Sequence, residues 1–434
     1  MQITGFMPVC AVSKGGGMEI IMDVTITPSV PTGSVKAPPG KSMAHRLLIA
    51  AGLCAGTSTI RGVSLSEDVL ATIDCLRALG AEVGILEETG GEPFPAEAKA
   101  PAVRMLPAEE KIILVRGTDP ARAKAACLPC RESGSTLRFF APLCMLSGEK
   151  MRLEGSRTLL GRPLFVYEEI CREQKILFQK EDPACAAQIY SEQEILFQKG
   201  DPACAAPGGA LEDQGSLVPG GALAGQGNPA PGGALLVQGN LAPGDYVLDG
   251  NVSSQFVTGL LFALPLLEKA STLSLRPPVE SRPYIDMTMA ALRRFGVETA
   301  WEGAARIRIP GGQRYLPQDI RVEGDWSNAA FFLALGVPVT GLAADSLQGD
   351  RVCVEYFRAL DQGPAELSLA DCPDLGPVLF AYAALHHGGT FTDTRRLRIK
   401  ESDRGAAMQE ELRKFGIRME VLDNRISVGS GVRP

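Results

Sequence analysis

The sequence has few histidines, no excess of positive charge and no apolar run of membrane-spanning length. Its net charge is −7, so the summed field of the chain attracts neither nucleic acids nor an acidic membrane surface. The longest apolar stretch, residues 256–267, falls short of the roughly 20 residues that cross a bilayer, and it contains Pro265. We therefore expect no nucleic-acid partner and no membrane anchor.

Histidine is scarce and the cysteines are not spaced as metal ligands. The three histidines are His45, His386 and His387, and none has a spaced set of cysteine or carboxylate partners, so no metal site is expected. The 11 cysteines are spread along a long chain, and several lie within apolar helical patterns rather than at loop staples. This distribution predicts reduced thiols and a cytoplasmic protein. Residues 1–22 lack the apolar region of a signal peptide, and we expect them to be disordered or an overcalled start.

What the sequence does contain is enough apolar material for two cores and a long-range repeat. The chain has 434 residues, of which 45% are hydrophobic and 21% charged. A small or polar turn followed by a strongly apolar helix and a strand recurs at Gly40, Glu132, Asn251, Gly324 and Pro373. A second pattern, in which a helix ends in Leu-Arg-x-Leu/Phe-Gly before a strand, recurs at residues 76–83, 292–299 and 412–419. These repeats predict an α/β protein built of βαβαββ-like units.

Residues 173–238 follow a different rule. Glu173-Gln-Lys-Ile-Leu-Phe-Gln-Lys recurs almost unchanged at Glu192, and Pro-Gly-Gly-Ala-Leu begins at Pro207, Pro219 and Pro231. Short repeats rich in glycine, proline and alanine bury too little apolar surface to offset chain entropy, so we predict a flexible expansion. A partner-binding arm or a small solenoid is the alternative.

Polar residues gather where the apolar helices begin. A helix start offers unpaired N–H groups and a partial positive charge, so several starts facing one cleft would bind phosphate and carboxylate groups. In the first segment Lys41, Ser42 and Arg46 surround such a start, although this segment taken alone favours a capped surface helix. A phosphate-binding loop of the Walker type needs glycine where Lys36 stands, which disfavours an ATPase.

Four further segments fit the same scheme. Gly134 and Arg138 follow Glu132, and Ser253, Ser254 and Gln255 follow Asn251, although each set is also an ordinary helix cap. Asp374 lies at another helix start, as an N-cap or an acid-base group. The richest segment is residues 396–404, where alternation predicts Arg396, Arg398 and Lys400 on one strand face, and Glu401 and Arg404 as an i, i+3 pair at the next helix. A solvated charge run is the alternative for this segment.

Taken together and in order, these segments resemble the 5-enolpyruvylshikimate-3-phosphate synthase family, from about residue 24 to residue 428 outside the expansion. Further matches are Ser281-Arg-Pro-Tyr284, Gly161-Arg162-Pro and Gly324-Asp325. The resemblance implies an enolpyruvyl transferase fold of two domains, each built of βαβαββ units, with the third unit of one domain incomplete here. The first domain would comprise residues 23–39 and 323–434, and the second residues 40–322.

The resemblance also implies an activity. The enolpyruvyl group of phosphoenolpyruvate moves to the 5-hydroxyl of shikimate 3-phosphate, with loss of phosphate, in the shikimate pathway of aromatic amino acid biosynthesis. No cofactor is implied, and the enzyme is expected to be a monomer. Clustered cations and helix starts would offset the repulsion between two polyanionic substrates.

By the same resemblance, each candidate residue receives a role. The catalytic residues would be Lys41, Asp374 and Glu401, the last two for proton transfer. The residues for shikimate 3-phosphate would be Lys41, Ser42, Arg46, Ser253, Ser254, Gln255, Ser281, Tyr284, Asp374 and Lys400. The residues for phosphoenolpyruvate would be Lys41, Gly134, Arg138, Arg162, Gln255 and Arg404.

Three departures from the family pattern matter. Arg396 and Glu132 stand where the family commonly has asparagine. The family continues after Val428 with an Asp-His-Arg segment, a helix and a lysine, so the chain is expected to be truncated, and one alternative is a catalytically impaired homologue that only binds shikimate 3-phosphate. A second alternative is UDP-N-acetylglucosamine enolpyruvyl transferase, which its usual Lys-Asn pair, here Lys41-Ser42, disfavours.

Overall fold

The computed structural model describes most of the chain. The described stretches are residues 31–87, 110–181, 232–399 and 402–431. The predicted disordered start, the centre of the predicted expansion and two predicted site residues, Lys400 and Glu401, lie outside them.

One strand arrangement recurs in four four-stranded sheets. In each sheet the first two strands are parallel, and the third and fourth are antiparallel to their neighbours. Three sheets use strands that follow one another along the chain. In spatial order these are β5 (Ala126–Pro129), β6 (Met151–Gly155), β8 (Gly233–Gln238) and β7 (Leu177–Glu181); β9 (Asp245–Asp249), β10 (Ser271–Arg276), β12 (Arg306–Ile309) and β11 (Ala300–Glu302); and β15 (Ala365–Ser368), β16 (Gly389–Thr392), β18 (Arg425–Val428) and β17 (Met419–Val421).

The fourth sheet has an edge strand that comes from much later in the chain than its other strands. Its strands in spatial order are β13 (Asp319–Arg321), β2 (Thr57–Val63), β4 (Lys111–Arg116) and β3 (Glu82–Glu87). β13 pairs in parallel with β2, with Ile320 opposite Ile60. The strand that stands first in this sheet therefore comes last of the four along the chain. The predicted α/β architecture of βαβαββ units is therefore confirmed.

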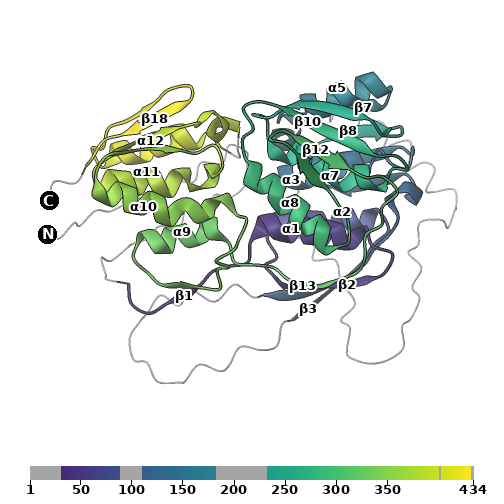
Figure 1. The fold of residues 1–434 in the computed structure, drawn as a ribbon, viewed down its shortest axis with the longest axis horizontal. Coiled ribbons are helices and arrows are strands. Elements are labelled where there is room, and N and C mark those ends of the chain that lie inside the picture. The colour runs from purple at the N-terminus through teal and green to yellow at the C-terminus, as the bar shows by residue number, and fades with distance from the viewer. Residues whose placement is uncertain (1–30, 88–109, 182–231, 400–401, 432–434) are drawn as a thin grey trace.

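Helices lie between the sheets of the larger half of the molecule, as Figure 1 shows for α1, α3 and α7. Those of the larger half are α1 (Lys41–Gly52), α2 (Glu67–Ala78), α3 (Gly134–Leu143), α4 (Arg157–Leu160), α5 (Phe165–Gln174), α7 (Ser254–Ala263) and α8 (Arg282–Arg294). Those of the smaller half are α9 (Trp326–Ala334), α10 (Cys353–Gln362), α11 (Gly376–Leu385) and α12 (Arg404–Lys414). Residues 256–263 of α7 are all buried, because a helix that is apolar all round needs neighbours on every side.

The buried apolar side chains form two separate clusters. One cluster runs from Ala44 to Val322 and the other from Trp326 to Val428. Two neighbouring stretches of chain cross between them, and they are held together by hydrogen bonds from Gly40 N to the Glu323 carbonyl (2.8 Å) and from Asp325 N to the Pro38 carbonyl (2.8 Å). We call the cluster from Ala44 to Val322 the first core and the cluster from Trp326 to Val428 the second core.

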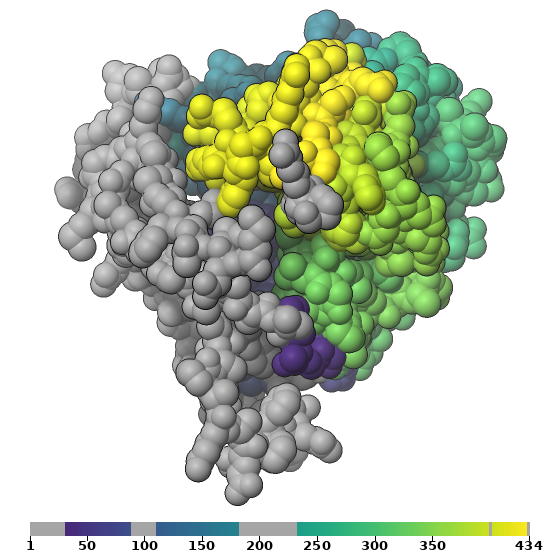
Figure 2. All heavy atoms as spheres, turned by 90° about the vertical axis from the view of Figure 1, so that its left-hand side faces the viewer, coloured from purple at the N-terminus to yellow at the C-terminus, as the bar shows by residue number. Residues whose placement is uncertain are grey.

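Beside the second core, the described residues form a small parallel pair, β1 (Val35–Lys36) with β14 (Val339–Thr340). In the space-filling view the purple residues near β1 lie against the green residues that follow the crossing (Figure 2). Through β1, residues near the start of the described chain pack beside the second core.

The predicted flexible expansion was too wide at both ends. Residues 173–181 include the end of α5 and strand β7, and residues 233–238 form β8, which pairs antiparallel with β7. The reason is that each end carries apolar residues, such as Ile176 and Leu235, that are buried in the first core.

The predicted strand through Arg396 and Arg398 was also wrong. Residues Arg395–Ile399 form a short 3₁₀ helix, η5. Side chains three apart share one side of such a helix, and Arg395 and Arg398 accordingly both pair with Asp423, with N···O distances of 2.8 Å and 3.1 Å. Leu397 is buried in the second core, and Arg396 pairs with Glu280 instead of Asp423.

Candidate active site

The two cores enclose a cavity of about 720 Å³ between them. Its walls contain every predicted site residue that the structure describes. These are Lys41, Ser42, Arg46, Gly134, Arg138, Arg162, Ser253, Ser254, Gln255, Ser281, Tyr284, Asp374 and Arg404. The walls also contain residues that were not assigned a role, among them Ser66, Asp68, Ser135, Asp325, Asn328 and Arg396. Lys400 and Glu401 lie outside the described residues, so their predicted roles stay predictions.

The cavity lies where several helices begin, as the repeated sequence pattern predicted. Lys41 is the first residue of α1 and Gly134 the first of α3. The caps are local: Ser133 Oγ accepts a hydrogen bond from Thr136 N, and Ser253 Oγ accepts one from Gln255 N. The first N–H groups of a helix have no carbonyl one turn earlier to bond, and they carry partial positive charge, which favours anionic ligands in the cavity.

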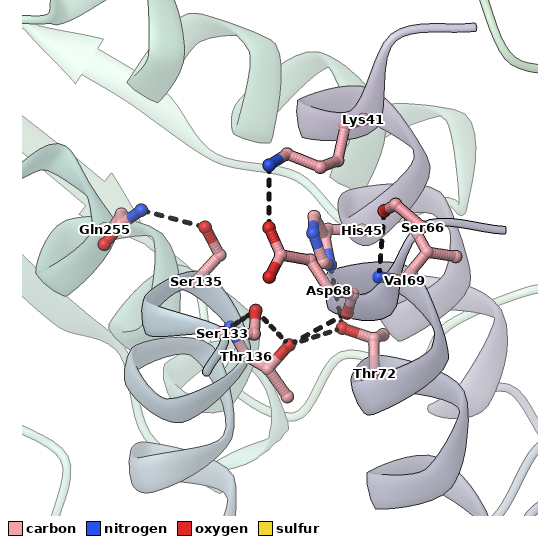
Figure 3. A network of polar contacts seen from close by, with 10 residues as sticks. All are labelled: Lys41, His45, Ser66, Asp68, Val69, Thr72, Ser133, Ser135, Thr136 and Gln255. Atoms are coloured by element: carbon pink, nitrogen blue, oxygen red, sulfur yellow. Dashed lines mark hydrogen bonds and ion pairs between the residues drawn. The ribbon is translucent and has the colours of Figure 1, made fainter. Parts of the chain in front are cut away.

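Lys41 forms an ion pair that the sequence did not reveal. Its Nζ lies 2.7 Å from Asp68 Oδ2, on the first turn of α2 (Figure 3). Burial opposes ionisation of Asp68, but the hydrogen bond and charge of Lys41, with the charge of Arg162, outweigh it and lower the pKa of Asp68. Asp68 is therefore a carboxylate at neutral pH, and an anionic ligand must compete with it for Lys41. In the sequence, Ser66-Glu67-Asp68 reads only as a capped helix start.

A chain of buried polar contacts lies behind this pair (Figure 3). His45 Nδ1 is 2.7 Å from Thr72 Oγ1, Thr72 Oγ1 is 2.9 Å from Thr136 Oγ1, and Thr136 Oγ1 donates to Ser133 Oγ over 2.8 Å. Burial lowers the pKa of His45 to about 3, so its ring is neutral at physiological pH. The chain of contacts ties α1, α2 and α3 together directly beneath their cavity-facing starts.

Arg46 lines the cavity but has several partners in the protein. Its Nε donates to Thr288 Oγ1 (2.8 Å), and its two Nη groups donate to the carbonyls of Ser42 (2.6 Å) and Tyr284 (3.1 Å). Burial lowers its pKa to about 10, which leaves it charged at neutral pH. Arg46 thus joins α1 to the start of α8 as well as adding positive charge to the cavity.

On the α3 and α7 side, arginine and amide groups form a second polar set. Arg138 Nη1 donates to Gln255 Oε1 (2.6 Å), and Gln255 Nε2 donates to Ser135 Oγ (2.9 Å). Arg162 lies against Gly134 so closely that a Cβ atom added to this glycine would be 2.6 Å from its Nη1. The absence of a side chain at Gly134 therefore lets this guanidinium reach the start of α3.

Tyr284 connects the first core to carboxylates of the second. Its Oη lies 2.8 Å from Asp350 Oδ2 and 3.1 Å from Asp374 Oδ2. Burial and these two carboxylates raise the pKa of Tyr284 well above its ordinary value, so the phenol keeps its proton. Arg404 Nη1 lies 2.6 Å from Asp374 Oδ1, so these two side chains form an ion pair at the cavity wall. Asp350 was missed because the short 3₁₀ helix that holds it, η3 (Gly349–Val352), carries no motif of its own.

Among the residues that the structure describes, no helix is long and apolar enough to cross a bilayer. The same part of the chain holds no group of three or more histidine, cysteine and acidic side chains placed to bind a metal ion. The cavity instead combines cationic side chains, hydroxyl groups and helix starts with a carboxylate, Asp374, on the facing side. Such an arrangement can bind small anions and transfer protons to or from them.

Comparison with known proteins gives a consistent result. The family model described as EPSP synthase (3-phosphoshikimate 1-carboxyvinyltransferase) matches residues 27–167 and 233–433. A 3-phosphoshikimate 1-carboxyvinyltransferase of Clostridium kluyveri is 34% identical, with 93% of this chain and 83% of the relative covered. That of Clostridium perfringens is 32% identical, with 94% and 85% covered. None of these matches supports the predicted truncation.

Solved structures show the same fold. An EPSP synthase from Acinetobacter baumannii matches with a TM-score of 0.59 and 20% sequence identity, over 92% of this chain and 82% of that one. A second structure of the enzyme from the same organism matches with a TM-score of 0.58.

Proposed function

The chain belongs to the EPSP synthase family, and from this premise we propose which residues of its cavity carry the activity. The activity itself is that of a 3-phosphoshikimate 1-carboxyvinyltransferase, a transferase of the shikimate pathway that uses phosphoenolpyruvate and shikimate 3-phosphate. The impaired-homologue and UDP-N-acetylglucosamine alternatives are not favoured by the relatives. The single observation that supports placing the reaction in this cavity is that its walls contain every described residue predicted from the sequence.

Shikimate 3-phosphate is proposed to bind along the starts of α7 and α8. Ser253, Ser254 and Gln255 begin α7, and Ser281 and Tyr284 lie at the start of α8. Hydroxyl and amide groups suit the hydroxyls and phosphate of this substrate. Lys41, Ser42 and Arg46 from α1, with Asp374 from the facing side, belong to the proposed set. Lys400, which lies outside the described residues, completes it.

Phosphoenolpyruvate is proposed to bind beside it, at the start of α3. The proposed contacts are Lys41, Gly134, Arg138, Arg162, Gln255 and Arg404. Lys41 would serve both substrates and leave Asp68 when they bind, because two anions then replace one carboxylate.

Proton transfer is proposed for Asp374 and Glu401. Attack by the substrate hydroxyl needs a base, and formation of the methyl group of the tetrahedral intermediate needs an acid. Asp374 faces the cavity with Arg404 and Tyr284 as its neighbours, which suits a group that changes its proton count during turnover.

The proposal also covers the division into domains, the oligomeric state and the location of the enzyme. The first domain comprises residues 23–39 and 323–434 and the second residues 40–322, a division that the two separate cores support. The enzyme acts as a monomer in the cytoplasm.

Phosphate release measured with both substrates tests this assignment. Lys41→Met should lower kcat/KM by about a hundredfold or more, because two charged hydrogen bonds of roughly 1.5 to 3 kcal/mol each are removed. Lys414→Met is the matched control, since Lys414 also forms an ion pair (2.7 Å to Glu411) but lies outside the cavity walls. Equal activity of the two variants would contradict the proposed site.

A further inference from the structure

Arg396 is a buried cation that connects the two cores at one edge of the cavity. Its residue exposure is 7%, and its Nε lies 2.8 Å from Glu280 Oε2. One Nη group donates to Ser281 Oγ over 2.5 Å, and the other donates to the carbonyl of Ala370. Arg396 and Ala370 lie in the second-core part of the chain, whereas Glu280 and Ser281 directly precede α8 of the first.

The segment that Arg396 holds has an unusual backbone. Ser281 has a φ of +56°, in the left-handed region that residues other than glycine rarely occupy. Its N–H donates to the same Ala370 carbonyl (3.0 Å), and the next N–H, of Arg282, donates to Asp371 Oδ1 (3.2 Å). The start of α8 is therefore shaped by contacts with the second core, since a left-handed serine persists only where its surroundings impose it.

Glu280 is a half-buried carboxylate that offsets the charge of the buried Arg396. Burial raises the pKa of Glu280, and the charge of Arg396 opposes that rise. The side chains of Arg396 and Glu280 are only 9% and 16% exposed, so water screens their attraction weakly. A substrate phosphate that drew Arg396 away would leave this carboxylate unpaired beside it, which is electrostatically unfavourable.

We propose that Arg396 is a positioning residue: by holding Glu280, Ser281 and the Ala370 carbonyl together, it fixes the Ser281 hydroxyl and the start of α8 for shikimate 3-phosphate, without binding that substrate itself. This inference rests on the proposed binding of shikimate 3-phosphate along α8. It gives a physical role to the arginine at a position where asparagine is common in the family.

Substitution of both partners distinguishes positioning from direct binding. If Arg396 acts through Ser281, Glu280→Gln and Arg396→Asn both raise KM for shikimate 3-phosphate, each about tenfold, with a smaller change in kcat. The double variant is then little worse than Arg396→Asn alone, because both changes break one unit. Arg396→Lys keeps the charge beside Glu280 but loses the planar guanidinium, so its KM for shikimate 3-phosphate should lie between those of the unmodified protein and Arg396→Asn.

The matched control is Arg395→Asn. It removes the neighbouring arginine, whose guanidinium contacts Asp423 at the surface, and should leave KM and kcat unchanged. If Glu280→Gln leaves KM unchanged or lowers it while Arg396→Asn raises it, Arg396 binds the substrate directly and the proposal is wrong. If neither variant changes KM, the proposal is also wrong.

A second readout needs no substrate. Hydrogen exchange of the amides of Ser281, Arg282 and Tyr284 should become faster in ligand-free Arg396→Asn and Glu280→Gln, and stay as in the unmodified protein in Arg395→Asn. Unchanged exchange in the first two variants would overturn the positioning role. Failure of the proposed substrate site looks different: calorimetry would then show that Lys41→Met binds shikimate 3-phosphate as tightly as the unmodified chain.

Discussion

Substitution of Gly134 by alanine is a sharp test of the phosphoenolpyruvate site, because the structure defines what the added methyl group would meet. The new Cβ would lie 2.6 Å from Arg162 Nη1, and the next atom, Arg138 Nη1, would be 3.6 Å away. Nonbonded heavy atoms normally stay about 3.5 Å apart. The tip of Arg162 must therefore move by about 1 Å, while the backbone of α3 can remain in place.

The expected magnitude follows from this displacement. A hydrogen bond of normal length weakens greatly when it is stretched by about 1 Å, and one to a charged group contributes roughly 1.5 to 3 kcal/mol. Gly134→Ala should therefore raise KM for phosphoenolpyruvate by about tenfold to a hundredfold. KM for shikimate 3-phosphate and the melting temperature should change little, because the clash is with the end of a flexible side chain.

The assay is phosphate release with phosphoenolpyruvate varied at saturating shikimate 3-phosphate. Gly244→Ala is the control, because a Cβ atom at Gly244 has no atom within 4 Å. Gly134→Ala combined with Arg162→Ala should be no worse than Arg162→Ala alone, since the methyl group acts through that arginine. An unchanged KM for phosphoenolpyruvate in Gly134→Ala would refute the reasoning.

Three further predictions concern the framework of the site. Gly259→Ala places a Cβ 2.4 Å from Tyr167 Oη and should lower the free energy of unfolding by about 1 to 3 kcal/mol in urea titrations, whereas Gly244→Ala should not. Burial lowers the pKa of His45 to about 3, whereas a histidine in the unfolded chain has a pKa near 6.5. The contribution of neutral His45 to the free energy of unfolding is therefore complete above about pH 6.5 and is lost as the pH falls toward 3. His45→Gln should make this acid dependence shallower by up to about 1.4 kcal/mol per pH unit, measured by urea unfolding between pH 7 and pH 4. Asp68→Asn releases Lys41 from its ion pair, so calorimetry should show a tighter phosphate Kd at low salt and a smaller gain at high salt, where the charges are screened.

The parts of the molecule that sequence predicted well depend on local rules. Two helices end in Leu-Arg-Ala-Leu-Gly and Leu-Arg-Arg-Phe-Gly. The last glycine of each motif adopts the left-handed conformation, with φ of +100° at Gly80 and +76° at Gly296. The apolar helices and their capped starts follow from periodicity and capping, which act within a few residues. The cavity could be predicted because the polar residues that build it lie at these same starts.

The parts that sequence did not predict depend on distant partners. Asp68 and Asp350 gain their place from Lys41 and Tyr284, which lie 27 and 66 residues away along the chain. The charge alternation at Arg396 indicated a strand, but its buried partner Glu280 and the exposed Asp423 draw neighbouring arginines in different directions. No local pattern contains that information, because these pairs form only when residues far apart along the chain come together.

The order of the two cores along the chain bears on how the enzyme is made. Every residue of the first core lies between Ala44 and Val322, so that core can assemble on a ribosome before residues 326–428 have emerged. Until then Tyr284 lacks Asp350 and Asp374, and Ser281 lacks Arg396. The cavity thus cannot be complete before the second-core part of the chain is made, and a nascent chain halted before Arg396 would lack cavity residues such as Arg396 and Arg404 even with its first core assembled.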